Sequence, residues 1–339
     1  MIEYRETKEK TKSLKEQYVR GFEKLIAEKE QQLAQERKDY CKNIFKNSEK
    51  YRRDLKQMLG WPLCESMDQK SIVADLTKLD VAETFTLYRV QLEVLEGLRL
   101  SGLYFEKKGA LKKPLVLVQH GGLGTPELIS GIYDGDTANY NDMLARVLQY
   151  DVHVFAPQLL LWDEKRYEVA CARRELDARL KRVGSSVAAV ELYGLMRALD
   201  YFEAKENVAS LGMVGLSYGG FYTLYLAALD TRIKSAVSCS FFNTRDQYPW
   251  SDLTWFSSAK KFDDAEVAAM VYPRKLCIAL GSKDELFSAA HGIRSYEALV
   301  ELCREVGTDW LSFLTFDGGH EFCKDDAPIK ALVHELADV

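Results

Sequence analysis

Several signals for export, membrane insertion and metal binding are missing from this sequence. No stretch approaches about 18 uninterrupted apolar residues, and the first ten residues, MIEYRETKEK, contain neither an apolar core nor a small-residue cleavage site. The seven cysteines are odd in number, scattered, and never form a Cys-x-x-Cys pair, which disfavours a disulfide framework and a zinc site. We therefore expect a cytoplasmic protein with reduced thiols and without a membrane partner.

A surplus of positive charge is also missing, because 46 Lys and Arg residues face 51 Asp and Glu residues and give a formal net charge of −5. This balance predicts no general attraction to nucleic acid. There is no internal repeat and no Gly/Ser-rich linker, and the seven prolines are sparse. With 47% hydrophobic content, residues 61–339 are expected to form one domain around a large core.

Residues 1–60 differ from the rest in charge and in pattern. They carry 16 Lys and Arg against 11 Asp and Glu, and their apolar residues recur at the period of one helical face. We predict an amphipathic helical arm, as one long helix or two shorter ones, that packs its apolar stripe on the main body. A homo-oligomer formed through residues 1–60 is the alternative. The stripe consists of Leu14, Tyr18, Phe22, Leu25, Leu33, Tyr40, Ile44, Tyr51, Leu55 and Met58.

From residue 81 onward the pattern is that of strands and helices in alternation. Residues 84–92 and 98–106 alternate apolar and polar side chains, which predicts an antiparallel pair half exposed to water. This pair and the runs after it predict an α/β fold with a mainly parallel central sheet flanked by helices. The apolar strand-like runs are 114–118, 152–156, 211–216, 233–237, 276–280 and 311–316, and the helical stretches are 140–149, 186–204, 221–229, 288–306 and 327–337.

The sequence GLSYGG at 215–220 joins a buried strand directly to a helix, with no residues to spare for a loop. The chain must reverse direction at Ser217, and Gly215 and Gly219 lie where a side chain would clash in such a turn. The turn exposes the serine hydroxyl at the edge of the sheet, with the start of the next helix directed at it. We therefore predict a catalytic nucleophile at Ser217 rather than a structural turn.

A serine hydroxyl needs a base near neutral pH, usually a histidine, and the sequence has only five histidines. His153 alternates within a strand, and His291 and His334 lie within helical segments, so structural roles are expected for them. His120 directly follows a strand and is expected to brace the glycine loop after it. His320 follows the last predicted strand on a loop that is free to reach a site, and is the predicted base.

The carboxylate that orients this base should follow the carboxyl end of a strand. Asp284 comes first after the strand at 276–280 and is favoured, while its neighbour Glu285 is a competitor suited to opening the next helix. Asp246 and Asp317 are weaker alternatives, more typical of loop and turn residues.

Backbone amides complete the predicted site. The amide of Tyr218, at the start of the helix after the serine, is expected to bind a developing oxyanion. The loop after His120 offers two further amides that no side chain shields, those of Gly121 and Gly122. Gly122 is the favoured second donor.

The order Ser217, Asp284, His320, with GLSYGG and the His-Gly-Gly loop, resembles the α/β-hydrolase superfamily over roughly residues 81–339. Within it, GLSYGG, LAALDTRIKSAV at 226–237 and FDGGHEF at 316–322 are similar to the branch of dienelactone hydrolases and acetyl xylan esterases. The resemblance implies an α/β-hydrolase fold, a serine esterase for short acyl esters such as acetylated sugars, and no cofactor. Serine at 217 departs from the cysteine nucleophile of a true dienelactone hydrolase.

Two segments, 160–185 and 240–270, are expected to cover the site as short caps. The second is rich in aromatic residues that could bind substrate, with ordinary packing as the alternative for most of them. The candidates for substrate binding are Phe241, Phe242, Trp250 and Trp255.

Clusters of charge in the first cap and before it invite other interpretations. A predicted helix carries a basic cluster that consists of Arg173, Arg174, Arg179, Lys181 and Arg182. We expect these side chains to form a solvated face of the helix; selection of an anionic substrate is the alternative. Three aspartates lie close together in the sequence, namely Asp134, Asp136 and Asp142. Their spacing is not that of a calcium-binding loop, and aspartate is common in turns and at helix N-caps, so we predict no metal.

The sequence thus predicts a serine hydrolase that cleaves carboxylic esters of small molecules through an acyl-enzyme intermediate. A thioesterase or peptidase with the same triad is the enzymatic alternative. A hydrolase-fold binding protein that uses its helical arm for partners is the alternative from another class.

Overall fold

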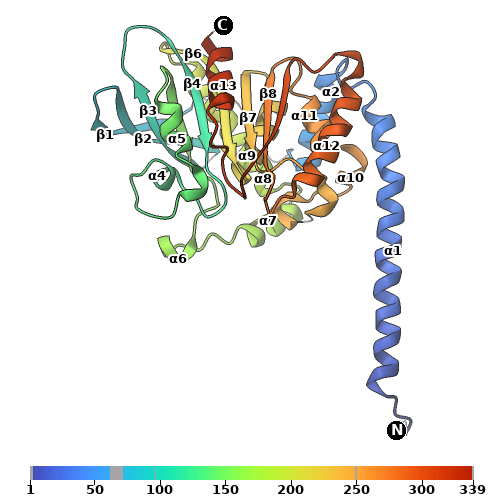
Figure 1. Cartoon of the computed structure of the whole chain (residues 1–339). Coiled ribbons are helices and arrows are strands. Elements are labelled where there is room, and N and C mark those ends of the chain that lie inside the picture. The colour runs from blue at the N-terminus through green and yellow to red at the C-terminus, as the bar shows by residue number, and fades with distance from the viewer. Residues whose placement is uncertain (1–2, 62–71, 96, 249, 338–339) are drawn as a thin grey trace.

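The protein is built around a single β-sheet. The structure is a computed structural model, and it describes residues 3–61, 72–95, 97–248 and 250–337. Within these residues, nine strands pair in the order β1-β2-β3-β5-β4-β6-β7-β8-β9 (Figure 1). The first three are antiparallel neighbours, namely β1 (Ala74–Val81), β2 (Phe85–Leu95) and β3 (Leu98–Lys107). β3 pairs antiparallel with β5, and the rest of the sheet is parallel: β5 (His153–Pro157), β4 (Lys113–Gln119), β6 (Val208–Leu216), β7 (Ile233–Cys239), β8 (Lys275–Gly281) and β9 (Leu311–Phe316).

Helices cover both faces of this sheet and create two apolar layers. One face packs against α5 (Met143–Leu148) and α13 (Ala327–Ala337), and the other against α8 (Val187–Glu203) and α9 (Tyr218–Leu229). The parallel strands alternate their side chains between the layers; Val116 and Val214 face the first, whereas Leu117 and Met213 face the second. The fold is the mainly parallel, helix-flanked α/β sheet that the apolar runs predicted.

The remaining helices lie at the edges of the sheet and in its connections. α11 (Asp264–Ala269) and α12 (Ala289–Leu302) flank the β8 end, and α6 (Glu164–Tyr167) and α7 (Arg173–Arg182) lie below the sheet in the view of Figure 1. α4 (Pro126–Ile129) and α10 (Ser258–Lys261) are single turns. Short 3-10 helices occupy Ala138–Tyr140, Arg245–Gln247, Ser251–Leu253 and Cys303–Glu305.

The sequence pattern did not reveal β1. It is an edge strand whose side chains are exposed almost throughout, so no buried face marks it. A register shift between Lys78 and Asp80 also interrupts the two-residue period along the strand.

The helical arm divides into two parts with different environments. It forms two helices, α1 (Lys8–Cys41) and α2 (Ser48–Leu59). α2 buries Tyr51, Leu55 and Leu59 in the core, and the buried guanidinium of Arg52 donates to the carbonyl oxygens of Ala228 and Met270 at 2.9 and 3.0 Å. This part packs on the body as expected.

The first part of α1 does not pack on the body and extends away from it (Figure 1). Contact with the body begins near Arg37, whose Nε and Nη1 atoms donate to Glu266 and to the carbonyl oxygen of Ala259 at 3.1 and 2.7 Å. On α1 before that point, six large apolar side chains are 51% to 70% exposed, namely Leu14, Tyr18, Val19, Phe22, Leu25 and Ile26. The expected packing of the stripe is therefore wrong for this half of α1, since the body offers no surface alongside it.

Candidate active site

Ser217 lies at a strained turn between β6 and α9. Its φ and ψ angles are 60° and −122°, and its amide donates to the carbonyl oxygen of Cys239 at 2.9 Å. The neighbouring glycines permit this conformation: a Cβ atom at Gly215 would lie 2.3 Å from the carbonyl oxygen of Gly219, and one at Gly219 would lie 2.2 Å from that of Gln119. The local sequence therefore places a serine at the carboxyl end of β6, where β4, β6 and α9 meet.

Asp284 and His320 come from the turns after β8 and β9 and meet at this edge of the sheet. The Nδ1 atom of His320 donates to Oδ2 of Asp284 at 2.9 Å, and Oδ1 of the same carboxylate accepts the amides of Leu286 and Phe287, both at 2.8 Å. The Asp284 side chain is buried, whereas that of His320 is 24% exposed. This pairing holds the proton on Nδ1, so Nε2 is left as the basic nitrogen.

The glycine loop after β4 lies against the serine turn. A Cβ atom at Gly121 would lie 3.1 Å from Cβ of Ser217, and one at Gly122 would lie 3.5 Å from the ring of Tyr218. The amide of Gly121 already donates to the hydroxyl of Tyr140 at 2.9 Å. Gly121 therefore has no amide proton to offer an oxyanion, which corrects the expectation that included it and leaves Gly122 as the favoured candidate in this loop.

His120 has the structural role that its position suggested. The residue is fully buried; its Nδ1 atom donates to the carbonyl oxygen of Gly121 at 2.9 Å, and Nε2 accepts the amide of Leu159 at 3.2 Å. Burial disfavours the charged ring and lowers the pKa of His120 to about 4. The neutral ring joins the glycine loop to the segment after β5.

The competing histidines and carboxylates have other surroundings. His153 accepts the amide of Lys107 at 3.0 Å and contacts the carbonyl oxygen of Asn207 at 3.1 Å, as a satisfied sheet residue. Glu285 and Asp246 are exposed, and Asp317 pairs with Lys283 at 2.5 Å. The remaining histidines, His291 and His334, lie on α12 and α13.

The four aromatic candidates for substrate binding have different environments. Phe241, Phe242 and Trp255 are at most 6% exposed and belong to the core. The rings of Phe241 and Trp255 pack against Phe221 of α9. All three side chains are buried and present no surface to a substrate, so the substrate-binding expectation fails for them. Trp250 is half-buried and stacks on Tyr218 with centroids 5.8 Å apart.

Trp250 also belongs to a group of rings that reaches the predicted base. Its centroid lies 5.4 Å from that of Phe287, and Phe287 lies 5.6 Å from the imidazole of His320. Tyr248 packs on Phe287 at 4.8 Å, and its hydroxyl accepts the amide of Ser288. An apolar wall of Trp250, Phe287 and Tyr248 thus lies beside His320.

A buried ionic network behind the serine turn was not apparent from the sequence. Nε of Arg173 donates to Asp252 at 2.7 Å and Nη1 to Glu191 at 2.8 Å, while the Tyr218 hydroxyl donates to Asp252 at 2.8 Å. Burial alone would lower the pKa of Arg173, but the Glu191 carboxylate and its neighbours raise it overall.

Arg173 is one of five basic residues in its segment, and only the fold distinguishes it from Arg174, Arg179 and Arg182, which are exposed. Lys181, the fifth, pairs with Asp177 at 2.6 Å. The favoured solvated face therefore describes the three exposed arginines and not Arg173, whose guanidinium is part of the protein interior.

Metal-binding clusters and membrane-spanning helices are absent from the part of the chain that the structure describes. There, no group of three or more His, Cys, Asp or Glu side chains could hold a metal ion. Asp136, in the acidic group considered for calcium, accepts the amide of Ala138 at 3.1 Å, as turn chemistry predicts. No helix in the same residues is long and apolar enough to cross a bilayer.

Comparisons with known proteins agree with this architecture. No protein-family model matches the sequence. A protein of Bacillus subtilis (strain 168) named "Putative hydrolase YtaP" is 27% identical over 263 residues, which span 73% of this chain and 84% of that protein.

Two solved structures from other bacteria share the fold. A putative acetyl xylan esterase from Bacteroides fragilis has a TM-score of 0.66 and 16% identity, over 81% of this chain and 76% of its own. A glucuronoyl esterase from Solibacter usitatus has a TM-score of 0.62 and 13% identity, over 84% of this chain and 91% of its own. The likeness bears out the resemblance that the motifs indicated: the chain has the α/β-hydrolase fold.

Proposed function

We propose that this chain is a serine esterase that hydrolyses carboxylic esters through an acyl-enzyme at Ser217. One observation carries the proposal: the hydrogen-bonded pair of His320 and Asp284 lies at the same sheet edge as a serine held in a strained strand-to-helix turn. The esterase names of the structural neighbours support the same chemistry.

In this mechanism the Ser217 hydroxyl attacks the ester carbonyl while Nε2 of His320 takes its proton. The tetrahedral oxyanion is bound by the amides of Tyr218 and Gly122. Tyr218 is the first residue of α9, so no helical carbonyl accepts its amide. His320 then gives the proton to the departing alcohol, and water attacks the acyl-enzyme by the same route and releases the acid.

Short acyl esters, including acetylated sugars, are the proposed substrate class. Trp250 and Tyr218 form an aromatic surface next to the serine turn, a surface on which the apolar face of a sugar or a small acyl group can pack. Six free, buried cysteines among the described residues support the further proposal that the protein works in a reducing, cytoplasmic compartment.

A panel of substrates tests this function. We expect p-nitrophenyl acetate and an acetylated xylose to be hydrolysed faster than the butyrate and octanoate esters, acetyl-coenzyme A and an aminoacyl p-nitroanilide. A fluorophosphonate should label the wild type and not Ser217→Ala. Turnover in the absence of fluorophosphonate labelling would contradict the serine mechanism, and faster cleavage of the thioester or the amide would contradict the substrate class.

A further inference from the structure

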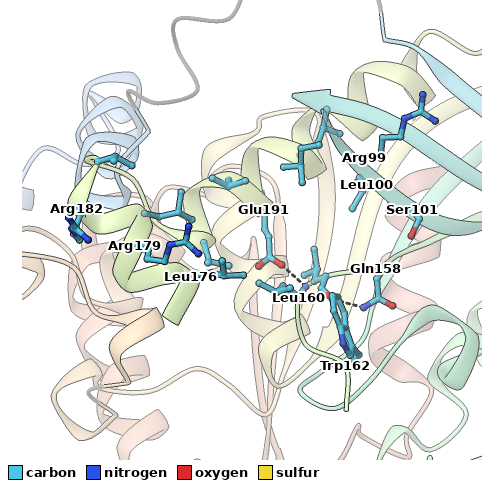
Figure 2. A pocket seen from close by; sticks show the side chains of 18 residues that line it. Arg99, Leu100, Ser101, Gln158, Leu160, Trp162, Leu176, Arg179, Arg182 and Glu191 are labelled. Atoms are coloured by element: carbon cyan, nitrogen blue, oxygen red, sulfur yellow. Dashed lines mark hydrogen bonds between the residues drawn. The ribbon is translucent and has the colours of Figure 1, made fainter. Parts of the chain in front are cut away.

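A cavity of about 920 Å³ lies beside the proposed active site and is separate from it. It is bordered by the start of β3, the segment after β5, α7 and α8 (Figure 2). Its walls are mainly apolar and include Val94, Leu100, Leu160, Trp162, Leu176 and Val190. Ser217, Asp284, His320 and the glycine loop do not line it. This volume is in the range of pockets that bind small molecules.

The segment after β5 forms the wall between the two sites. On one side, Leu159 donates its amide to His120, and Leu161 accepts the amide of Leu123 in the glycine loop at 2.7 Å. On the other side, Leu159 and Leu160 line the cavity. A ligand in the cavity therefore contacts a different surface from a substrate at Ser217.

Among the charged side chains around the cavity, Arg179 and Arg182 form no ion pair within the described residues. Arg179 and Arg182 lie on its α7 side, opposite Arg99 in the view of Figure 2. Arg99 pairs with Asp75 at 2.7 Å, whereas Arg179 and Arg182 have no ion pair or side-chain hydrogen bond with any residue in the described ranges.

Glu191 is a carboxylate in the cavity lining, but its charge is neutralised by other groups and should not repel an anionic ligand. Glu191 accepts the amide of Leu160 at 2.7 Å and pairs with Arg173 at 2.8 Å, and it also accepts the Tyr222 hydroxyl. Its charge is compensated within the protein. The net character of the cavity is apolar, with unpaired positive charge at its edge.

We propose that this cavity binds a carboxylic acid with a medium-length apolar chain, with the chain inside and the carboxylate at Arg179 and Arg182. Apolar burial supplies most of the affinity, and the two guanidinium groups select the anion. The proposal does not depend on the chemistry at Ser217.

Titration of full-length Ser217→Ala with sodium hexanoate, octanoate and decanoate, below their micelle concentrations, tests the site. Calorimetry gives the dissociation constant, and the part of the tryptophan fluorescence change that Trp162→Phe abolishes reports on the cavity, because Trp162 lines it. Each added CH2 should tighten binding about fourfold, because burying one contributes about 0.8 kcal/mol. Equal binding across the series, or no binding by decanoate, would overturn the proposal.

Variants of the lining locate the ligand. Arg179→Gln/Arg182→Gln should weaken decanoate binding roughly three- to tenfold and leave decanol binding unchanged, since the arginines are partly screened by water. Leu176→Trp should weaken the binding of both decanoate and decanol, because the larger side chain fills part of the cavity. Arg304→Gln, which removes an exposed arginine outside the lining, should have no effect. Loss of decanoate binding in this control, or none in the double variant, would overturn the assignment.

A second, independent observation concerns the exposed half of α1. Its unpacked residues run from Lys8 to Gln32, and Gly21 interrupts the apolar stripe with open space where a side chain would be. Leu14, Tyr18 and Leu25 border this gap and form a shallow groove along the helix. Because nothing lies within 4 Å of the position of a Cβ atom at Gly21, a large side chain of a partner can enter the groove there without a clash.

The geometry points to a second copy of this chain as the partner, with two α1 helices antiparallel. In the register that places Leu14 against Leu25 of the partner subunit, Tyr18 lies against the partner subunit's Gly21, so a large ring fills the gap. The same register places Lys8 opposite residue 31 of the partner subunit. The two helices therefore pair along nearly the whole exposed part of α1, from Lys8 to Gln32. The two bodies then lie at opposite ends of the helix pair.

Sedimentation velocity of the full chain tests this arrangement. We expect a dimer for the wild type and a monomer for Tyr18→Glu/Leu25→Glu, while Ala27→Glu, on the opposite face of the helix, should remain a dimer. Leu14→Cys/Leu25→Cys should form an intermolecular disulfide that Leu14→Cys alone does not form, because equal positions in two antiparallel helices lie roughly 16 Å apart. A monomeric wild type would overturn the pairing, and crosslinking of the single variant would overturn the antiparallel register.

Discussion

The Nδ1 atom of His320 lies 2.9 Å from Oδ2 of Asp284, although the two residues are 36 positions apart in the chain. The other carboxylate oxygen accepts two backbone amides, so the carboxylate cannot rotate without losing three hydrogen bonds. The imidazole of His320 is therefore oriented by a carboxylate that the fold itself fixes.

Asp284→Asn should preserve the fold and reduce kcat by roughly 10³- to 10⁴-fold. The amide oxygen can keep the backbone contacts, but the amide nitrogen would face Nδ1 of His320 and force the proton onto Nε2, which is the wrong tautomer for a base. Steady-state kinetics with p-nitrophenyl acetate measures the loss. Glu285→Gln is the matched control and should retain activity; a large loss there instead would identify Glu285 as the orienting carboxylate.

Ser217→Ala should reduce kcat by roughly 10⁶-fold, because no other nucleophile replaces the hydroxyl. The thermal midpoint should not fall, since alanine keeps the Cβ atom and removes only a hydroxyl. Kinetics and a melting curve on the same preparation check both points. Activity within tenfold of the wild type would exclude the acyl-enzyme mechanism.

Gly219→Ala should unfold the protein or lower its stability by several kcal/mol. The added Cβ atom would lie 2.2 Å from the carbonyl oxygen of Gln119, and backbone cannot move aside as a flexible side chain can. Gly194→Ala on α8 is the control, because its Cβ atom meets only Val94 at 3.5 Å. The control should be neutral or gain up to about 1 kcal/mol from helix propensity. Urea denaturation compares the two, and equal stability would argue against the tight turn.

Phe241→Ala and Trp250→Ala should separate packing from substrate binding. Phe241 is fully buried, so its truncation should cost about 3–5 kcal/mol of unfolding free energy. Trp250 is half-buried beside Tyr218, so its truncation should mainly raise KM and lower kcat/KM roughly tenfold. Denaturation and ester kinetics on both variants test this. A stability loss at Trp250 as large as that at Phe241, with KM unchanged, would contradict the division.

Stability should fall on acidification because of His120. Burial lowers its pKa to about 4 in the folded protein, against about 6.5 for a histidine in an unfolded chain. Between these values the unfolded state binds a proton that the folded state does not, so this contribution is present above pH ~6.5 and is lost as the pH falls toward ~4. The total is roughly 3 kcal/mol.

Urea denaturation at several pH values measures the slope. His120→Gln should be less stable at neutral pH, because the glutamine cannot reproduce both ring hydrogen bonds, and its stability should depend less on pH in this window. An unchanged slope in the variant would show that other groups, such as the buried His153, cause the acid sensitivity.

The local pattern of the sequence determined eight of the nine strands found in the described residues, their order along the chain and the turn at Ser217, but not the edge strand β1. These follow from the period of apolar residues and from the glycines that a sharp turn requires, and both are properties of neighbouring residues. The choice of His320 and Asp284 rested on their position after strands. That position is informative because parallel strands all end at one edge of the sheet.

Only the tertiary structure decided which side chains are buried and which are free. Arg173 and Arg179 belong to the same basic cluster, yet one is enclosed by Glu191 and Asp252 and the other lies at the edge of a cavity. Tyr140, distant in sequence, occupies the amide of Gly121 and leaves Gly122 free. The stripe on α1 has helical period over both its exposed and its packed half. Burial depends on contacts between distant segments, and the local spacing of residues does not encode them.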